Sequence, residues 1–398
     1  MKLCIRLYLV VIFCHAEPLP SPNPGLVHNF KTILDVMLDT GLGMLARSTT
    51  MEHRLTKNVA FSPISSIVLT GELMLRKSEK LPASESDLHQ QLGELLQLLE
   101  SAPNATKHFR VKRQDAVFVN KNITLSRNYV KKLRDLYETP VHYVDFKEDP
   151  EGAQRDINSW ASVNTQNHIR SVLPSPPPPA TSSIFSSACY LQADWQTPFA
   201  YALNKSQFFN LNSTTKVPIT YLFQQFNQIL YGESNDFLVA ALPYTAEEVR
   251  MYIILPNHQS RYKYDLKAFI SRISFDDVQE TIANAQRHDL LVKIPKMSLS
   301  RSFSVREDLK ENVGLKQENI DLEGAAVGGW LRVDDVMHQV VVDFDQKDVE
   351  YSNVDVLGST LVGGVKNFFV DRPFLFFVRH EATTAMLFMG AVCDPRVV

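Results

Sequence analysis

Few residues of this chain have the types and spacing that catalysis or metal binding requires. His380-Glu381 begins like a zinc-binding helix motif but lacks the second histidine. Gly41-x-Gly43-x-x-Ala46 imitates a dinucleotide-binding turn, yet it lies inside a helical pattern with no strand before it. The sequence holds no Gly-x-Ser-x-Gly nucleophile elbow and no Cys/His cluster with metal-ligand spacing. We therefore expect no enzyme, no metal site and no cofactor.

Asparagine and cysteine are the other residues that could carry covalent chemistry. Asn-x-Ser/Thr sequons, which are candidates for N-glycosylation, occur at Asn104, Asn122, Asn204 and Asn212. Cys189 and Cys393 lie in apolar, strand-like runs, where a buried cysteine behaves as a small hydrophobic residue. The other two of the four cysteines, Cys4 and Cys14, lie in the N-terminal segment expected to be cleaved as a signal peptide. The two that remain make no disulfide framework, so we favour two unpaired thiols over one bridge.

The N-terminus has the pattern of a secretory signal peptide over residues 1–16. Lys2 and Arg6 accompany a short apolar core, and Ala16 is a small residue suited to cleavage. The apolar run is too short to span a bilayer, and no later stretch is long enough. The sequence therefore predicts a secreted, extracellular protein without a membrane segment, with a loose proline-rich stretch over residues 17–25.

Composition and charge indicate a globular protein that does not bind nucleic acid. The 398 residues are 44% hydrophobic and 21% charged, and a formal net charge of −3 leaves no basic half. One basic cluster alternates as a solvated strand would, and we favour that interpretation over a polyanion-binding site: Lys107, His108, Arg110, Lys112 and Arg113.

Periodicity predicts helices early in the chain and strands later. Apolar residues recur at helical spacing over 26–47, 88–99, 126–137 and 157–173. A further helix is expected to start at Pro63, with Ser62 as its N-cap. Strand-like runs occupy 116–119, 184–195, 239–242, 251–255, 290–294, 340–344 and 374–378. Helices followed by strands indicate one α+β domain over residues 26–398.

Ordered motifs along residues 26–395 resemble those of the serpins, a family of serine protease inhibitors. They include Asn58-Val-Ala-Phe-Ser-Pro, Ala188-Cys-Tyr-Leu-Gln-Ala-Asp-Trp, Ile253-Ile-Leu-Pro and the closing Asp371-Arg-Pro-Phe. The resemblance implies a monomer with helices packed on a large central mixed β-sheet, smaller sheets, and an exposed reactive-centre loop over about 346–368. In that family a protease attacks the loop, and the main sheet must open to accept the loop as an extra strand.

The resemblance also places a scissile bond within the loop. Counting back from Pro373 gives Val362–Gly363. Valine suits an elastase-like specificity pocket rather than a trypsin-like one. The expected protease partner therefore has elastase- or chymotrypsin-like specificity.

The hinge of the loop departs from the family pattern, Glu-Glu-Gly-Thr-Glu followed by small residues. It consists of Gln346, Lys347, Asp348, Val349, Glu350, Tyr351, Ser352, Asn353, Val354 and Asp355. On insertion, alternate side chains from Val349 to Asp355 would share the buried face. Tyr351 would overpack a slot made for alanine at ~1–3 kcal/mol, and unpartnered Asn353 would cost ~1–3 kcal/mol. Burying the ionised Asp355 carboxylate would cost several kcal/mol more, unless the carboxylate bound a proton.

Two further departures bear on insertion. Ser187 replaces the asparagine of the family, which loosens the hydrogen-bonded latch that the resemblance implies with Ser65 and His338. Gln346 lacks the charge that would pair with Lys296, although an exposed pair of that kind is worth only ~0–1 kcal/mol.

Two functions remain open at this point. The first is a secreted, serpin-like binding protein, carrier or protease substrate with lost or weakened trapping, whose partner is a protein or small-molecule ligand. The second is a working suicide inhibitor of an elastase- or chymotrypsin-like protease. A barrier to insertion that is higher by ~3 kcal/mol slows insertion more than a hundredfold. Hydrolysis of the acyl-enzyme would then be faster than insertion. The hinge therefore favours the first.

Overall fold

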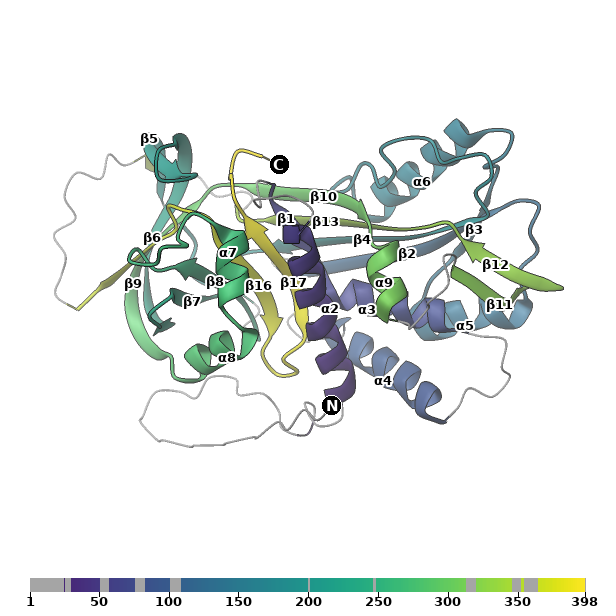
Figure 1. Ribbon diagram of the computed structural model, residues 1–398, viewed down its shortest axis with the longest axis horizontal. Coiled ribbons are helices and arrows are strands. Elements are labelled where there is room, and N and C mark those ends of the chain that lie inside the picture. Colours follow the sequence, from purple (N-terminus) through teal and green to yellow (C-terminus); the bar gives the residue numbers. More distant parts are fainter. Residues whose placement is uncertain are drawn as a thin grey trace.

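The helices occur mainly in the first part of the chain and the strands mainly in the second, as the sequence predicts (Figure 1). The computed structural model describes residues 25, 30–50, 57–75, 83–100, 109–199, 201–245, 248–312, 320–345, 352–353 and 364–397. Its helices of several turns are α2 (Lys31–Thr50), α3 (Pro63–Met74), α4 (Ala83–Glu100), α5 (Arg127–Tyr137), α6 (Pro150–Asn164), α7 (Leu266–Arg272), α8 (Phe275–Ala283) and α9 (Arg306–Asn312).

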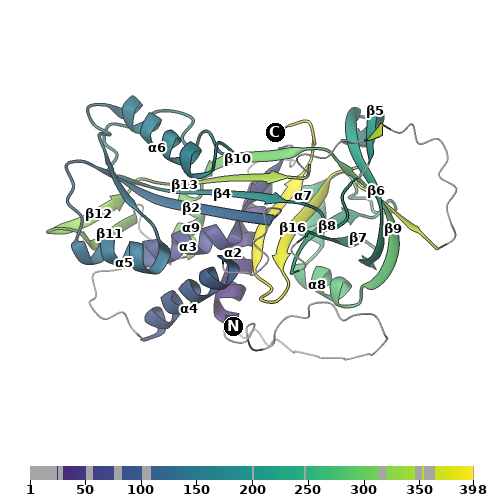
Figure 2. The same cartoon turned by 180° about the vertical axis from the view of Figure 1, so that it is seen from behind.

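One sheet of five strands runs along the upper half of Figure 1. Its order is β10 (Ser298–Ser304), β13 (Asp335–Asp343), β4 (Ser183–Ala193), β2 (Phe109–Asn120) and β3 (Val141–Val144). Helix α6 covers one face, and α3 and α5 lie on the other, with α4 beyond them (Figures 1 and 2). Because both faces are covered, the central strands β4 and β13 are buried on both sides, and their apolar residues are interrupted by buried polar ones such as Ser187 and His338.

A second sheet of ten strands fills the other end of the molecule. Its main path is β1 (Val59–Phe61), β17 (Met386–Val392), β16 (Phe374–His380), β8 (Val249–Pro256), β7 (Phe237–Pro243), β6 (Lys216–Glu233), β5 (Tyr201–Asn210) and β14 (Ser352–Asn353). Off this path, β9 (Gln286–Pro295) pairs with β6, and β15 (Lys366–Phe369) pairs with β9. A separate hairpin joins β11 (Ile320–Ala326) to β12 (Gly329–Val333). The α+β class is therefore confirmed.

Helix α3 starts where the sequence predicts. The Ser62 side chain accepts a hydrogen bond from the Ser65 amide, and Pro63 occupies the first helical position. Proline costs nothing there because the first amides of a helix have no intrahelical acceptor. The cap thus fixes the end of α3 that faces β13.

The helix predicted over 157–173 is wrong at both ends, since α6 begins at Pro150 and ends at Asn164. The Thr165 hydroxyl donates to the Ala161 carbonyl and accepts from the Ile169 amide, which turns the chain. Asn167 then takes a left-handed backbone with φ of 65°. Residues beyond the turn, such as Ile169 and Val172, are still buried in the core beneath α6. Their spacing in the sequence resembles that of a helix, although they are not helical.

Candidate functional site

The site that the loop would enter is the seam between β4 and β13. The two strands are hydrogen-bonded neighbours and run parallel, with Asp335 opposite Ile184 at one end and Val342 opposite Leu191 at the other. A chain that leaves β13 and turns back would run antiparallel to both strands. The five-stranded sheet is therefore closed at the seam but could admit a sixth strand there if β4 and β13 separated.

The side of the seam that faces α3 is almost entirely apolar. Phe185, Cys189 and Leu191 of β4 and Val336, Val340 and Val342 of β13 are buried in one core cluster with the residues of α3. The same alternation places Ser187 and His338 on this side, directly opposite each other in the parallel pair. A strand that entered the seam would set every second side chain into this layer.

Ser187 and His338 form an incomplete latch. The Ser62 amide donates to His338 Nε2 at 3.0 Å, so Ser62 and not Ser65 makes the contact from α3. His338 Nδ1 and the Ser187 hydroxyl are both buried and have no hydrogen-bond partner, as expected if serine is too short to reach across. Burial lowers the pKa of His338 to about 3, so the ring is neutral at physiological pH.

Most of the predicted loop lies outside the described residues. This holds for the hinge positions Gln346, Lys347, Asp348, Val349, Tyr351 and Asp355, and for the reactive bond Val362–Gly363. Ser352 and Asn353 are described as β14, whose backbone pairs in parallel with Tyr201 and Ala202 of β5. At Asn353, therefore, the loop lies against the ten-stranded sheet and not in the seam.

The first end of the loop is fixed by an ion pair that the sequence did not predict. Lys296 Nζ lies 3.1 Å from an Asp345 carboxylate oxygen, one residue before Gln346. The cation expected to lack its partner at Gln346 thus has one nearby. Both side chains are about one-third exposed, so the pair is worth only ~0–1 kcal/mol.

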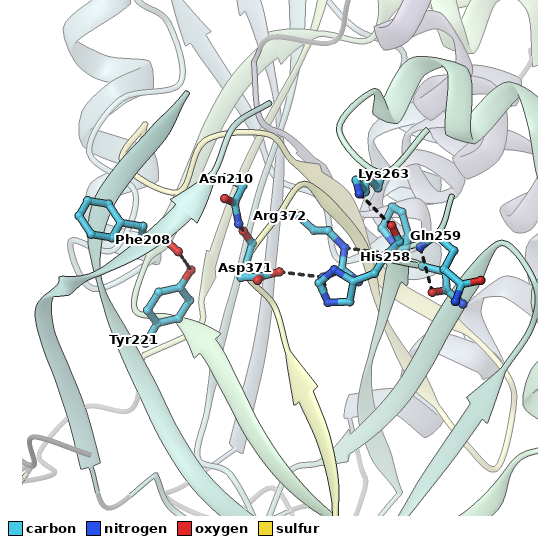
Figure 3. Close-up of polar contacts among 10 residues, drawn as sticks. Phe208, Asn210, Tyr221, His258, Gln259, Lys263, Asp371 and Arg372 are labelled. Atoms are coloured by element: carbon cyan, nitrogen blue, oxygen red, sulfur yellow. Dashed lines mark hydrogen bonds and ion pairs between the residues drawn. The ribbon is translucent and has the colours of Figure 1, made fainter. Parts of the chain in front are cut away.

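The second end of the loop is anchored more firmly (Figure 3). The Asp371 carbonyl accepts hydrogen bonds from the amide and the side chain of Asn210, at 2.8 and 2.9 Å. The Arg372 side chain is buried and donates to the Pro256 carbonyl at 2.8 Å and to the Asp371 carboxylate at 2.7 Å. Its Nη1 atom also lies 3.1 Å from His258 Nε2. This network holds the chain where it leaves the loop.

The other predicted residues are placed as follows. Asn122 lies exposed in the turn after β2, and Asn212 is half-buried in a turn where its side chain accepts from the Thr214 amide. Asn104 lies outside the described residues, and of Asn204 only the backbone, in β5, is described. Cys189 and Cys393 are buried and are not joined in a disulfide, as expected.

The basic cluster is only partly a solvated strand. Lys107 and His108 lie outside the described residues, whereas Lys112 is exposed on β2. Arg113 is instead only partly exposed, and it forms an ion pair with the buried Asp115. The alternating pattern predicted the strand β2 correctly. It could not show that Arg113 points inward, because that depends on its ion pair with Asp115.

Sequence reasoning missed an apolar cavity of about 210 Å³ outside the seam. It lies between α2, α8 and the strands β8, β16 and β17, and is lined in part by Leu42, Leu45, Ile254, Phe275, Val278 and Phe377. Ser274 is its one polar lining residue, and its oxygen already accepts from the Asp277 amide. Such a lining can hold an uncharged apolar molecule. The helical spacing of Leu42 and Leu45 can be read from the sequence. The sequence does not show that α8 and the strands β8, β16 and β17 lie opposite them.

Two kinds of feature are absent from the described part of the chain. No helix there is long and apolar enough to cross a membrane. Among the same residues, no three His, Cys, Asp or Glu side chains are grouped so as to hold a metal ion.

Comparison with known proteins identifies the family. Residues 42–395 match the model of the serpin (serine protease inhibitor) family, so the chain belongs to the serpins. It is 30% identical over 302 residues to intracellular coagulation inhibitor 1 of Tachypleus tridentatus, covering 72% of this chain and 70% of that protein. It is 28% identical over 310 residues to plasminogen activator inhibitor 2 of Homo sapiens, covering 75% and 74% respectively.

The fold has a counterpart among solved structures. Human thyroxine-binding globulin, solved with thyroxine bound, superposes with a TM-score of 0.76 at 18% identity, covering 92% of this chain and 99% of that one. This likeness confirms the serpin fold. The named relatives therefore include both inhibitors and a binding protein.

Proposed function

We propose that this chain is a secreted, extracellular serpin-family protein in which protease trapping is lost or weakened, and that it acts as a binding protein and not as an enzyme. One observation carries the proposal. The layer of the seam that faces α3 is apolar apart from Ser187 and a neutral His338. The hinge would set Asn353 and Asp355 into this layer, where β4 and β13 offer the Ser187 hydroxyl and His338 Nδ1 as polar groups but no cation for the carboxylate.

The consequence is kinetic. Trapping requires the loop to enter the seam before water hydrolyses the acyl-enzyme. Insertion would separate β4 from β13 along the whole of their pairing and then bury the hinge side chains. A barrier higher by ~3 kcal/mol slows insertion more than a hundredfold, and the protease then leaves with the loop cleaved.

A working suicide inhibitor is the second candidate, and one observation favours it. The closed parallel seam and the position of Asn353 against β5 are the arrangement that a serpin needs before insertion. An inhibitor of this kind would present Val362–Gly363 to an elastase- or chymotrypsin-like protease.

Residual protease activity separates the two candidates. An elastase-like enzyme incubated with a tenfold molar excess of the chain should keep its activity while it cleaves the loop near Val362–Gly363. The cleavage site is read by mass spectrometry of the released fragment. Loss of activity in proportion to the chain added would favour the inhibitor instead.

The apolar cavity supports a ligand for the binding function. Its walls come from the three helices α2, α7 and α8 and from three strands, and its lining offers no charged group. A cavity of about 210 Å³ is somewhat larger than the 150 Å³ that admits benzene in an engineered apolar site. The complex of thyroxine-binding globulin with thyroxine is an example of a protein of this fold that binds a small molecule. We propose an uncharged, apolar small molecule as the ligand.

Filling the cavity should abolish binding of a neutral apolar probe. N-phenylnaphthylamine fluorescence should show saturable binding to the native chain, and Ala46→Trp should weaken it at least tenfold because the indole occupies the cavity. Val36→Trp is the matched control, since Val36 is exposed on the same helix and does not line the cavity. Absence of saturable binding, or equal loss in both variants, would exclude the cavity as a ligand site.

A further inference from the structure

A buried polar cluster lies where α3, α4, α5 and β2 meet, away from both the seam and the cavity. At its centre is Glu72, whose side chain is fully buried on α3. The Thr139 hydroxyl donates to Glu72 Oε1 at 2.5 Å. The other carboxyl oxygen, Oε2, is buried and has no hydrogen-bond partner. A buried carboxylate usually has charged or multiple donors, so this environment suits a carboxylic acid better than its anion.

The helices around Glu72 are packed through polar side chains. The Tyr137 hydroxyl of α5 is hydrogen-bonded to His89 Nδ1 of α4, and the two rings meet edge to face at 5.8 Å. A Cβ atom at Gly71 would lie 2.4 Å from the Tyr137 oxygen, so only glycine leaves room for this contact. Tyr129 of α5 ends in a buried hydroxyl without a partner. Glu72 therefore sits beside the contact that joins α4 to α5.

Charged groups approach Glu72 from the remaining elements. On β2, Arg113 lies near enough to favour the carboxylate, but it forms an ion pair with the buried Asp115. On α5, Lys132 acts on His89 and disfavours a charge on that ring. Arg113 is therefore the cation that acts on Glu72, and Glu72 shares it with Asp115.

We propose that Glu72 is a proton-operated switch that sets how tightly α4 and α5 pack against α3. With its proton, Glu72 fits the apolar side of the cluster and the helices close around the Tyr137–His89 contact. When Glu72 is deprotonated, its carboxylate moves toward the Thr139 hydroxyl and Arg113. The packing between α4 and α5 then loosens. The same helix carries Ser62, which holds His338, so the switch lies on the element that supports the seam.

The protonation states of the cluster agree with this geometry. Burial raises the pKa of Glu72 to about 7, against the lowering effects of the Thr139 hydrogen bond and Arg113. Burial lowers the pKa of His89 to about 4, so His89 stays neutral where Glu72 titrates. Burial also raises the pKa of Tyr129 and of Tyr137, so both hydroxyls keep their protons.

The sign of the pH dependence follows from the raised pKa. Between the unfolded value of 4.5 and about 7, the folded chain keeps a proton that the unfolded chain has released. Stability from this group is full below pH 4.5 and is lost as the pH rises through about 7. The equilibrium constant of unfolding should rise by on the order of a hundredfold from this group over that interval.

Infrared spectroscopy across pH 5–9 tests the switch directly. The carbonyl band of a buried carboxylic acid should disappear with a midpoint near 7, while the protection factors of the α4 and α5 amides, corrected for the intrinsic pH dependence of hydrogen exchange, fall over the same range. Glu72→Gln keeps the shape and should abolish both changes. Glu94→Gln, on the exposed side of α4, should leave both unchanged.

A second variant distinguishes titration of Glu72 from a purely structural role. Thr139→Val removes the hydrogen bond that favours the anion, so the midpoint of the carbonyl band should move to higher pH. The proposal is overturned if the band is absent at pH 6, or if it or the exchange profile keeps the same midpoint in Glu72→Gln. It is likewise overturned if Thr139→Val leaves the midpoint in place.

Discussion

Cleaving the reactive-centre loop should leave the melting temperature of this chain almost unchanged. In a serpin whose loop inserts, cleavage lets the loop complete the main sheet and releases stored strain. Here the entering strand would have to part β4 from β13 and set Asn353 and Asp355 into an apolar layer. The cost of burying the unpaired carboxylate offsets the gain from the added strand.

Thermal unfolding before and after limited proteolysis measures this effect. Mass spectrometry should first confirm that the cut lies between residues 346 and 363, so that the rest of the chain is intact. A rise in melting temperature of tens of degrees after cleavage would show that the loop inserts, and would defeat the account of the hinge given above. The outcome does not depend on which protease is physiological.

Repairing the hinge should restore insertion. A variant with Asp348→Gly, Tyr351→Ala, Asn353→Ala and Asp355→Thr regains backbone freedom and removes bulk and polarity from the face to be buried. Cleavage of this variant should raise the melting temperature by tens of degrees, and an elastase-like enzyme should be trapped. The four contributions should not add simply, because neighbours in one strand are coupled.

A matched control alters the opposite face of the same segment. Glu350→Ala, Ser352→Ala and Val354→Thr change residues that alternate with the inward-facing set, and should leave both readouts as in the native chain. If the repaired hinge shows neither trapping nor thermal gain, the block lies in the sheet or its covering helix. The run Pro176–Pro179 after that helix and the unpartnered Ser187 would then be the sites to change next.

Local signals in the sequence predicted the framework of this molecule. The Ser62 cap and Pro63 fixed the start of α3, because both act through backbone groups within one turn. In the five-stranded sheet, the apolar runs predicted β4 and parts of β2 and β13, whereas β3 and β10 were not predicted. The family resemblance placed the seam and loop along the chain, and the comparisons confirm the family.

Contacts between distant segments could not be predicted in the same way. The length of α6 was misjudged because Ile169 is buried beneath it without being helical. The latch contact came from Ser62 and not Ser65, which depends on how α3 sits on β13. Glu72 looked like an ordinary polar residue in a helix, and its burial follows only from the meeting of three helices and a strand.

Incubation with elastase-like and chymotrypsin-like proteases, followed by a denaturing gel, shows whether this chain traps a protease. A serpin that traps its protease holds it as a covalent acyl-enzyme that survives denaturation. For this chain we expect cleavage of the loop near Val362–Gly363 and no band at the summed mass of chain and protease. A denaturant-stable complex formed in high yield would contradict the account and establish the chain as a working inhibitor.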